Sequence, residues 1–318
     1  MHQTKTVSMT EGGVLAAIAV VFAMISAYIP VLGSFVNLIW PVPIILLGVR
    51  HGYRWSIMAT VVSGVIIAIT MHPLHAVTVV VGFGLIGIAL GHAFRMDAGP
   101  FKSMLWGSIA SLISKIAVFY IAFLVMGVNP LTTQVSAMSE AVNQAVAIYR
   151  NFGMKEAELT KLADTMNALV GYMKIIFPAG LILASVVDTY LNFVIARKVL
   201  KKLGHHVKSF PPFKLWSIPA YVAYAFFLSV VLTFWGNAQQ LTMVYRVGLN
   251  LQVILSIFLL IQGLALFYFL ADKYNLSRIT RSIILVLVFT NGLFLQILVL
   301  SGAFDIAFDY RRLRYPRS

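Results

Sequence analysis

The stretch Val247–Leu270, VGLNLQVILSIFLLIQGLALFYFL, decides the fold class of this chain. Its 24 residues include no Asp, Glu, Lys or Arg. As a helix it would extend about 36 Å at a rise of 1.5 Å per residue, enough to cross a hydrocarbon core of about 30 Å. The whole chain of 318 residues is 60% hydrophobic and only 11% charged, against about 25% charged residues in a soluble domain. We therefore expect an all-α polytopic membrane protein.

About nine transmembrane helices are predicted from runs of this kind. They are Gly13–Leu32, Val36–Val49, Trp55–Thr70, Ala76–Phe94, Met104–Met126, Val170–Ala196, Leu215–Trp235, Val247–Leu270 and Ser282–Ser301. The second is short and contains Pro41 and Pro43, which lack backbone donors, so we expect it to be kinked or partly irregular. Irregular backbone persists at membrane depth only where it is buried in protein or lines a cavity. Asn37–Pro43 is thus the first indication of a binding cavity.

The short loops predict the orientation. Arg50–Arg54, Arg95–Lys102 and Arg197–Lys214 carry basic residues, whereas Met71–His75 has neither Lys nor Arg. Positively charged loops remain in the cytoplasm, so we expect a cytoplasmic N-terminus. Nine spans would then place the C-terminus outside, although the tail holds Arg311 and three further arginines. Either the tail overrides the rule, or one of the last three segments does not cross.

Charge and motif content exclude several functions. The formal charge of +14 comes from residues between apolar runs, so orientation and anionic lipid explain it better than nucleic acid does. With no Cys, thiol catalysis, disulfides and Cys metal sites are absent. The sequence has no G-x-x-x-x-G-K-[ST], H-E-x-x-H or G-x-S-x-G motif. We expect no enzyme activity and no cofactor, and any energy source would come from a partner or an ion gradient.

One long connection, residues 128–169, is predicted to lie outside as an amphipathic helical hairpin. Apolar residues recur at helical spacing on both sides of a turn at Asn151–Gly153. The hairpin would lie on the surface or extend the flanking spans; alternatively, it would be a lid over an outward-facing cavity.

Two charges inside spans are expected to pair. Lys115 lies about 16 Å from the cytoplasmic start of the fifth span, and Asp188 lies about 13 Å from Arg197 on the sixth. A charge at a helix centre costs about 2.5–3.5 kcal/mol on insertion scales, which favours a buried pair. The pair would lock two helices together or serve a proton or ion relay; alternatively, Lys115 would extend to the interface.

Polar residues in the outer half suggest a ligand pocket. These are Asn37, Trp40, His72, His75 and Lys174. A few polar groups among apolar walls are typical of small-molecule sites, and Lys174 would meet an anionic or hydrogen-bond-accepting group. Two histidines without a nearby Cys, Asp or Glu are too few ligands for a metal site. Without such a pocket, the two histidines would face water and Lys174 would extend to the lipid headgroups.

Small residues on the first span form a possible docking face. Ala19, Ala23 and Ala27 are spaced four apart, which lets another helix approach closely. That helix would belong to a partner, or to this chain itself through ordinary internal packing.

The N-terminal part of the chain resembles a known group of transport proteins. Gly13-Val-Leu-Ala-Ala-Ile-Ala-Val, followed by Pro41-Val-Pro-Ile-Ile-Leu-Leu-Gly48 and Gly52, is similar to the S components of energy-coupling-factor vitamin transporters. Those proteins have six helices, and their first helix docks on a membrane coupling subunit through small residues. The resemblance implies a six-helix domain over residues 1–203, a partner coupling subunit with an ATPase module, and docking through Ala19, Ala23 and Ala27.

A second resemblance is to the YybS family of uncharacterised bacterial membrane proteins. It rests on Asp188-x-x-x-Asn192, Arg197–Gly204, Phe210-Pro-Pro-Phe213-x-x-Trp216-x-x-Pro219 and Gly302-Ala-Phe-Asp305-x-x-Phe-Asp-x-Arg311. It implies the plasma membrane of a bacterium, with residues 204–318 forming additional C-terminal helices and a basic tail.

Two functional hypotheses follow. The first is an S-component-type protein that binds or transports an unknown small molecule without its own ATPase. The second is a non-transporting scaffold or assembly factor for envelope machinery.

Overall fold

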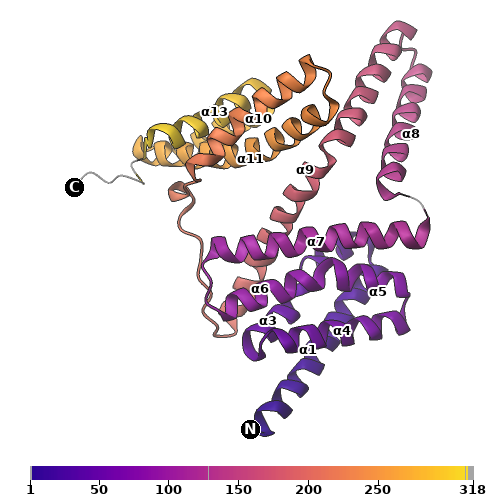
Figure 1. The fold of residues 1–318 in the computed structure, drawn as a ribbon, viewed down its shortest axis with the longest axis vertical. Helices are drawn as coiled ribbons and strands as arrows, with labels where there is room; N and C mark the ends of the chain where they lie inside the picture. The colour runs from indigo at the N-terminus through magenta and orange to yellow at the C-terminus, as the bar shows by residue number, and fades with distance from the viewer. Residues whose placement is uncertain (1, 128, 312, 314–318) are drawn as a thin grey trace. The chain divides into compact units, whose positions relative to one another are not determined.

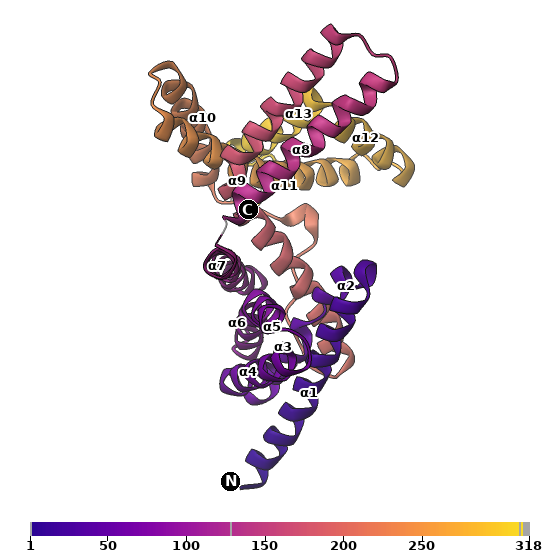
Figure 2. The ribbon, with the colours of Figure 1, turned by 90° about the vertical axis from the view of Figure 1, so that its right-hand side faces the viewer.

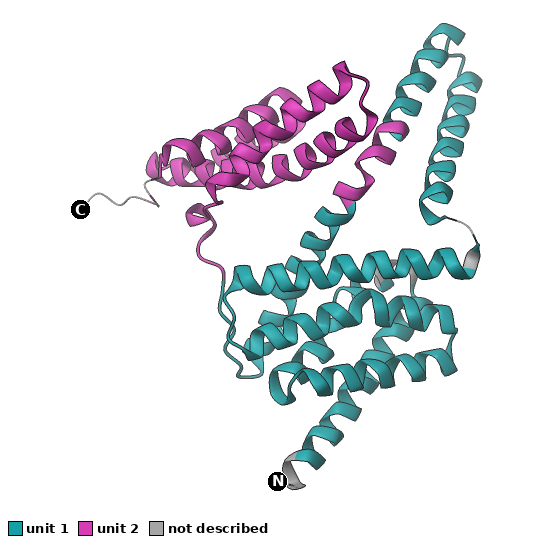
Figure 3. Ribbon diagram, in the orientation of Figure 1, with its two compact units in different colours: residues 1–170, 181–209 teal, residues 171–180, 210–318 magenta. Residues whose placement is uncertain are grey.

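The structure, a computed structural model, describes residues 2–127, 129–311 and 313 (Figure 1). Every regular element in this part of the chain is a helix. The chain divides into two compact units (Figure 3): unit 1 contains residues 1–170 and 181–209, and unit 2 contains residues 171–180 and 210–318. The division between 209 and 210 lies close to the boundary expected after residue 203, but the segment 171–180 also belongs to unit 2.

The helices begin and end where local chemistry favours it. Five of them (α2, α3, α5, α7 and α8) start with a proline, which has no backbone donor to leave unpaired there. The helices up to the unit boundary are α1 (His2–Tyr28), α2 (Pro30–Asn37), α3 (Pro41–His51), α4 (Tyr53–Thr70), α5 (Pro73–Val79), α6 (Leu85–Arg95), α7 (Pro100–Met126), α8 (Pro130–Asn151) and α9 (Glu156–Lys202), with a π-helical segment η1 (Val80–Gly84) between α5 and α6. Those that follow are η2 (Phe213–Leu215), α10 (Ala220–Ala238), α11 (Thr242–Lys273), α12 (Arg278–Thr290) and α13 (Gly292–Phe308).

Seven helices of the described chain are long and apolar enough to cross a membrane, which confirms the polytopic all-α class. They lie at Lys5–Tyr28, Tyr53–Thr70, Pro73–Arg95, Pro100–Val125, Glu156–Lys202, Ala220–Ala238 and Thr242–Lys273. They match seven of the nine expected spans. The second and ninth expected spans differ, each for a local reason.

The second expected span, Val36–Val49, is broken. A turn at Leu38–Trp40 separates α2 from α3, and α3 has only 11 residues. The segment nevertheless runs back along α1. Asn37 Oδ1 accepts a 2.6 Å hydrogen bond from Ser26 Oγ near the end of α1, and His51 Nδ1 lies 2.7 Å from Ser8 Oγ near its start. The segment therefore runs antiparallel to α1, with the irregular backbone that the prolines predicted.

The long connection is a helical hairpin, as the sequence predicted (Figures 1 and 2). Gly153, with φ of +82°, makes the turn after α8. Arg150 spans that turn with Nε 2.9 Å and Nη2 3.1 Å from the two carboxylate oxygens of Glu156. The second helix of the hairpin does not end at the sixth span. It continues into it, so that α9 is a single helix of 47 residues.

A proline interrupts α9 within unit 2, and a side chain of α11 repairs the break. Pro178 lies inside the helix. Next to it, Asn250 Oδ1 accepts from the backbone nitrogen of Ala179 at 2.9 Å, and Asn250 Nδ2 donates to the carbonyl of Ile175 at 2.9 Å. Residues 175 and 179 are four apart, so the amide supplies both halves of a hydrogen bond that an uninterrupted helix would make itself.

Unit 2 packs around α11. Its core consists of Val222, Ala223, Phe226, Leu259, Ala303 and Ile306, from α10, α11 and α13. Glycines let these helices approach closely. A Cβ at Gly263 would collide with the carbonyl of Leu298, and one at Gly302 would collide with the carbonyl of Leu259. Such approaches through small residues favour helix association in lipid.

The ninth expected span, Ser282–Ser301, is a bent pair rather than one helix. The axes of α12 and α13 differ by 108° across Asn291. Both ends of the pair meet at Lys214: Lys214 Nζ lies 2.8 Å from Asp272, which pairs with Arg281 at 2.6 Å, and the Lys214 carbonyl accepts from Arg311 at 2.7 Å. A bent pair of this kind is either a broken span or a re-entrant loop, and the shared neighbourhood of its two ends favours the re-entrant loop.

This geometry bears on the conflict raised by the basic tail. Within unit 2, Arg311 lies beside Lys214, the last basic residue of the connection between the sixth and seventh expected spans. This neighbourhood favours the second of the two alternatives, in which one of the last three segments does not cross. Of the remaining tail arginines, Arg312, Arg314 and Arg317 lie outside the described residues.

Candidate functional site

Lys115 and Asp188 lie together within unit 1. Lys115 Nζ is 2.8 Å from Asp188 Oδ2, as the two adjacent spans predicted. Gly107 allows this crossing of α7 and α9, because a Cβ there would collide with Thr189. The exposed fractions of the two charged side chains are 24% and 14%.

Two neutral side chains complete this group. Ser111, one helical turn before Lys115, donates to Asp188 Oδ2 at 3.0 Å and accepts from Lys115 at 2.6 Å. Asn192, one turn after Asp188, donates to its Oδ1 at 3.0 Å. Ser111 and Asn192 are fully buried. The carboxylate thus has three donors from two helices, which is the arrangement of a clamp. A proton or ion relay through it remains a prediction.

The five outer residues occupy different environments. Trp40 is fully buried, Asn37 is half-buried against Ser26, and His72 caps the start of α5 by accepting from Leu74 N at 3.2 Å. His75 is half-buried on α5. These four belong to unit 1.

Lys174, the fifth of these residues, belongs to unit 2 and is exposed. A single ligand site made of all five residues remains a prediction. Within the described residues, no group of three His, Cys, Asp or Glu side chains is placed to hold a metal ion.

The alanine face of α1 requires a correction. Ala19 and Ala23 are fully buried within unit 1, where α1 packs against α3 and α4. Ser63 of α4, for example, donates to the Ala16 carbonyl at 3.4 Å, one turn from Ala19. The small residues therefore admit helices of this chain, and a partner helix cannot reach Ala19 or Ala23 without unpacking them. Ala27, in contrast, is exposed.

A second charged group, in unit 2, was not expected from the sequence. Arg311 donates from Nε to Asp305 Oδ2 at 3.0 Å, with Nη2 also 2.8 Å from that oxygen, and the exposed fractions of the two side chains are 1% and 2%. Gln262 donates to the same carboxylate oxygen at 2.6 Å and accepts from Ile218 N at 2.9 Å. Arg311 also donates to the carbonyls of Lys214 and Trp216, both at 2.7 Å. This Arg311 cluster fastens the loop before α10 to α11 and α13.

A third group joins the start of α1 to the end of α3. Glu11 forms an ion pair with Arg50 and a hydrogen bond with His51, whose Nε2 lies 2.6 Å from Glu11 Oε2. Arg50 Nε also donates to His205 Nε2 at 3.0 Å. Since Arg50 and His51 are the last residues of α3, the group holds the end of the short segment in register with α1.

These features define an integral membrane protein of several helical passes with internal charge clamps. Residues 17–306 match the family described as "Predicted membrane protein (DUF2232)", and the chain belongs to that family. It is 24% identical over 311 residues to "Uncharacterized protein YybS" of Bacillus subtilis (strain 168), covering 98% of this chain and 99% of that protein. No solved structure matches the chain.

Proposed function

We propose that the protein is a small-molecule binding component of S-component type in the bacterial plasma membrane, with a cytoplasmic N-terminus. In this proposal it takes up its ligand from the outer side and has no catalytic activity of its own. A membrane coupling subunit and an ATPase module would be partners. Support for the orientation comes from the basic residues of the Arg50–Arg54 and Arg197–Lys214 segments, which favour the cytoplasm.

Two buried polar atoms without partners carry the proposal. Trp40 Nε1 and His75 Nε2 are buried and have no hydrogen-bond partner among the described residues. Buried polar groups are nearly always paired, so such atoms indicate a missing partner such as a ligand or water. Both lie in unit 1, where the second pass is broken at Leu38–Trp40 and η1 adds a π-helical turn after His75. Irregular helices of this kind often accompany binding sites.

Native mass spectrometry of the detergent-purified protein tests this proposal. We expect a small molecule to co-purify with the wild type, and its occupancy to fall when Trp40→Phe or His75→Leu removes one polar atom. Trp235→Phe, at an exposed position of unit 2, is the matched control and should leave the occupancy unchanged. A wild-type protein that carries no such molecule, or equal occupancy in all variants, would contradict the proposal.

The alternative function is a scaffold for envelope machinery, and one observation is consistent with it. The loop Phe210–Pro219 holds three clustered aromatic side chains, with Trp216 centred 5.1 Å from both Phe210 and Phe213, on a backbone fixed by Arg311. A rigid loop of this composition suits either a membrane surface or a protein partner. Affinity purification distinguishes the two functions, because ATPase and coupling subunits support the first, and division or wall proteins support the second.

A further inference from the structure

A row of five side chains crosses one end of unit 1. The rings of Tyr53, His92 and Trp106 follow one another, with centroids 5.6 Å apart for the first pair and 5.7 Å for the second. A cation lies over each outer ring: Arg54 is 5.9 Å from the centre of Tyr53, and Lys102 is 5.1 Å from the centre of Trp106. The row therefore presents two positive charges held by aromatic faces.

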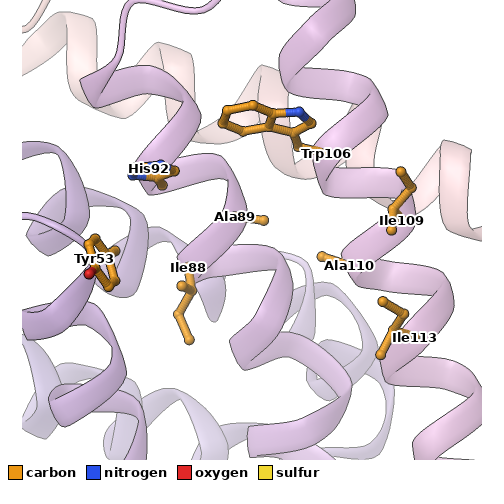
Figure 4. A pocket seen from close by; sticks show the side chains of 8 residues that line it. All are labelled: Tyr53, Ile88, Ala89, His92, Trp106, Ile109, Ala110 and Ile113. Atoms are coloured by element: carbon orange, nitrogen blue, oxygen red, sulfur yellow. The ribbon is translucent and has the colours of Figure 1, made fainter.

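The three rings form part of the wall of a hollow between α6 and α7 (Figure 4). Its volume is about 430 Å³, within the range of about 300–1,000 Å³ that is usual for small-molecule sites. Besides the three rings, its walls are aliphatic and consist of Ile88, Ala89, Ile109, Ala110 and Ile113. Ile109 and Ile113 are about half exposed, so the hollow is a groove on the surface of the unit rather than a closed cavity. A groove of this kind fits a flexible hydrocarbon chain.

The charged end of the groove lies where a membrane has its headgroups. Tyr53 and Arg54 begin α4, His92 is close to the end of α6, and Lys102 and Trp106 lie in the first two turns of α7. Arg95, which donates to the Val49 carbonyl at 3.2 Å, adds a further exposed cation at this end. Aromatic rings and cations at helix ends are typical of the interface between hydrocarbon and water.

We propose that this groove is a binding site for an anionic phospholipid. One acyl chain lies along the aliphatic walls formed by α6 and α7, and the anionic headgroup lies at the end of the groove that Arg54 and Lys102 flank. The occupant is a lipid rather than a partner helix, because both charged side chains of the row are cations while the remaining walls of the groove are apolar. This site is separate from the outer ligand of the proposed function and does not depend on it.

The first experiment measures lipid selectivity. The purified full-length protein is titrated in detergent with phosphatidylglycerol or phosphatidylcholine of identical acyl chains, and the bound lipid is counted by native mass spectrometry. We expect phosphatidylglycerol to bind more tightly. In the double variant Arg54→Gln, Lys102→Gln the preference should fall by about five-fold per cation, the factor that corresponds to about 1 kcal/mol for each charge near an anionic headgroup.

A matched variant controls for general loss of charge. Lys198→Gln with Lys201→Gln removes two exposed cations of α9 in the same unit. It should leave the preference unchanged. Equal binding of the two lipids to the wild type, or an equal loss of preference in both double variants, would overturn the proposal.

The second experiment locates the acyl chain. Phosphatidylglycerol brominated on its acyl chains quenches nearby tryptophans, so the quenched share of emission should fall in Trp106→Phe and stay unchanged in Trp235→Phe. Ala110→Phe fills the groove and should lower the binding of both lipids several-fold, whereas Ala17→Phe, at an exposed position of α1, should not. If Ala110→Phe does not fold, the quenching measurement decides: quenching that is the same with and without Trp106 would overturn the proposal.

Discussion

Replacing Arg311 by Met should destabilise unit 2 specifically. The substitution keeps an unbranched, flexible side chain but removes every donor of the guanidinium. Asp305 then keeps only its hydrogen bond from Gln262, at a site where its side chain is 2% exposed. A buried carboxylate that loses its partner costs about 3–5 kcal/mol. The carbonyls of Lys214 and Trp216 lose their donors as well, so we expect a loss at the upper end of that range.

A second substitution separates charge from packing. In the double variant Arg311→Met, Asp305→Asn, the amide oxygen still accepts from Gln262, but no unpaired charge is buried. The double variant should therefore recover a large part of the loss, leaving mainly the cost of the two unpaired carbonyls. Arg278→Met, at an exposed position on α12, is the control and should change the stability by less than about 0.5 kcal/mol.

Two measurements check these expectations. Thermal unfolding in detergent gives the stability, and the rate of tryptic cleavage after Lys208 and Lys214 reports on the loop that Arg311 holds. Cleavage should accelerate in the single variant and slow again in the double variant. The reasoning is refuted if Arg311→Met has the melting temperature of the wild type. It is also refuted if the double variant loses as much stability as the two single substitutions added together.

Three further predictions concern unit 1 and the proline break. Lys115→Met or Asp188→Leu alone should destabilise by about 3–5 kcal/mol, and the pair together by clearly less; equal melting temperatures for the wild type and both single variants would refute the clamp. Asn250→Leu should accelerate hydrogen exchange at the interrupted turn of α9 and cost about 1–3 kcal/mol, which unchanged exchange would disprove. Ala23→Leu should cost about 1–3 kcal/mol by overpacking while the exposed Ala27→Leu does not, and equal melting temperatures would return Ala23 to a docking role.

Local patterns were sufficient to predict most of the fold. Apolar length predicted the long helices, and Asn151–Gly153 predicted the turn of the hairpin. Lys115 and Asp188 could be paired because they lie on consecutive spans at similar depth, so connectivity alone brings them together. The prolines of the second expected span predicted its irregularity, because a missing backbone N–H donor disturbs the helix within its own turn.

Contacts between distant segments could not be predicted in this way. Arg311 reaches Lys214 across 97 positions of sequence, and no periodic pattern relates the two. One signal was nevertheless present: Gln262 and Asn250 are polar residues in a predominantly apolar span, and such residues usually face a partner inside the protein. The bend at Asn291 was indicated as well, because Asn-Gly is a turn sequence in the middle of an expected helix.

The fastening of the loop by Arg311 has a consequence for biosynthesis. Membrane helices emerge from the ribosome in order, and the residue that secures the segment before α10 emerges only after α13. A polypeptide interrupted anywhere before residue 311 therefore leaves the aromatic loop unfastened and Asp305, if already made, uncompensated. Partly folded chains of this kind are the species that aggregate and that quality-control proteases recognise. The late contact thus delays the stable folding of unit 2 until Arg311 has been synthesised.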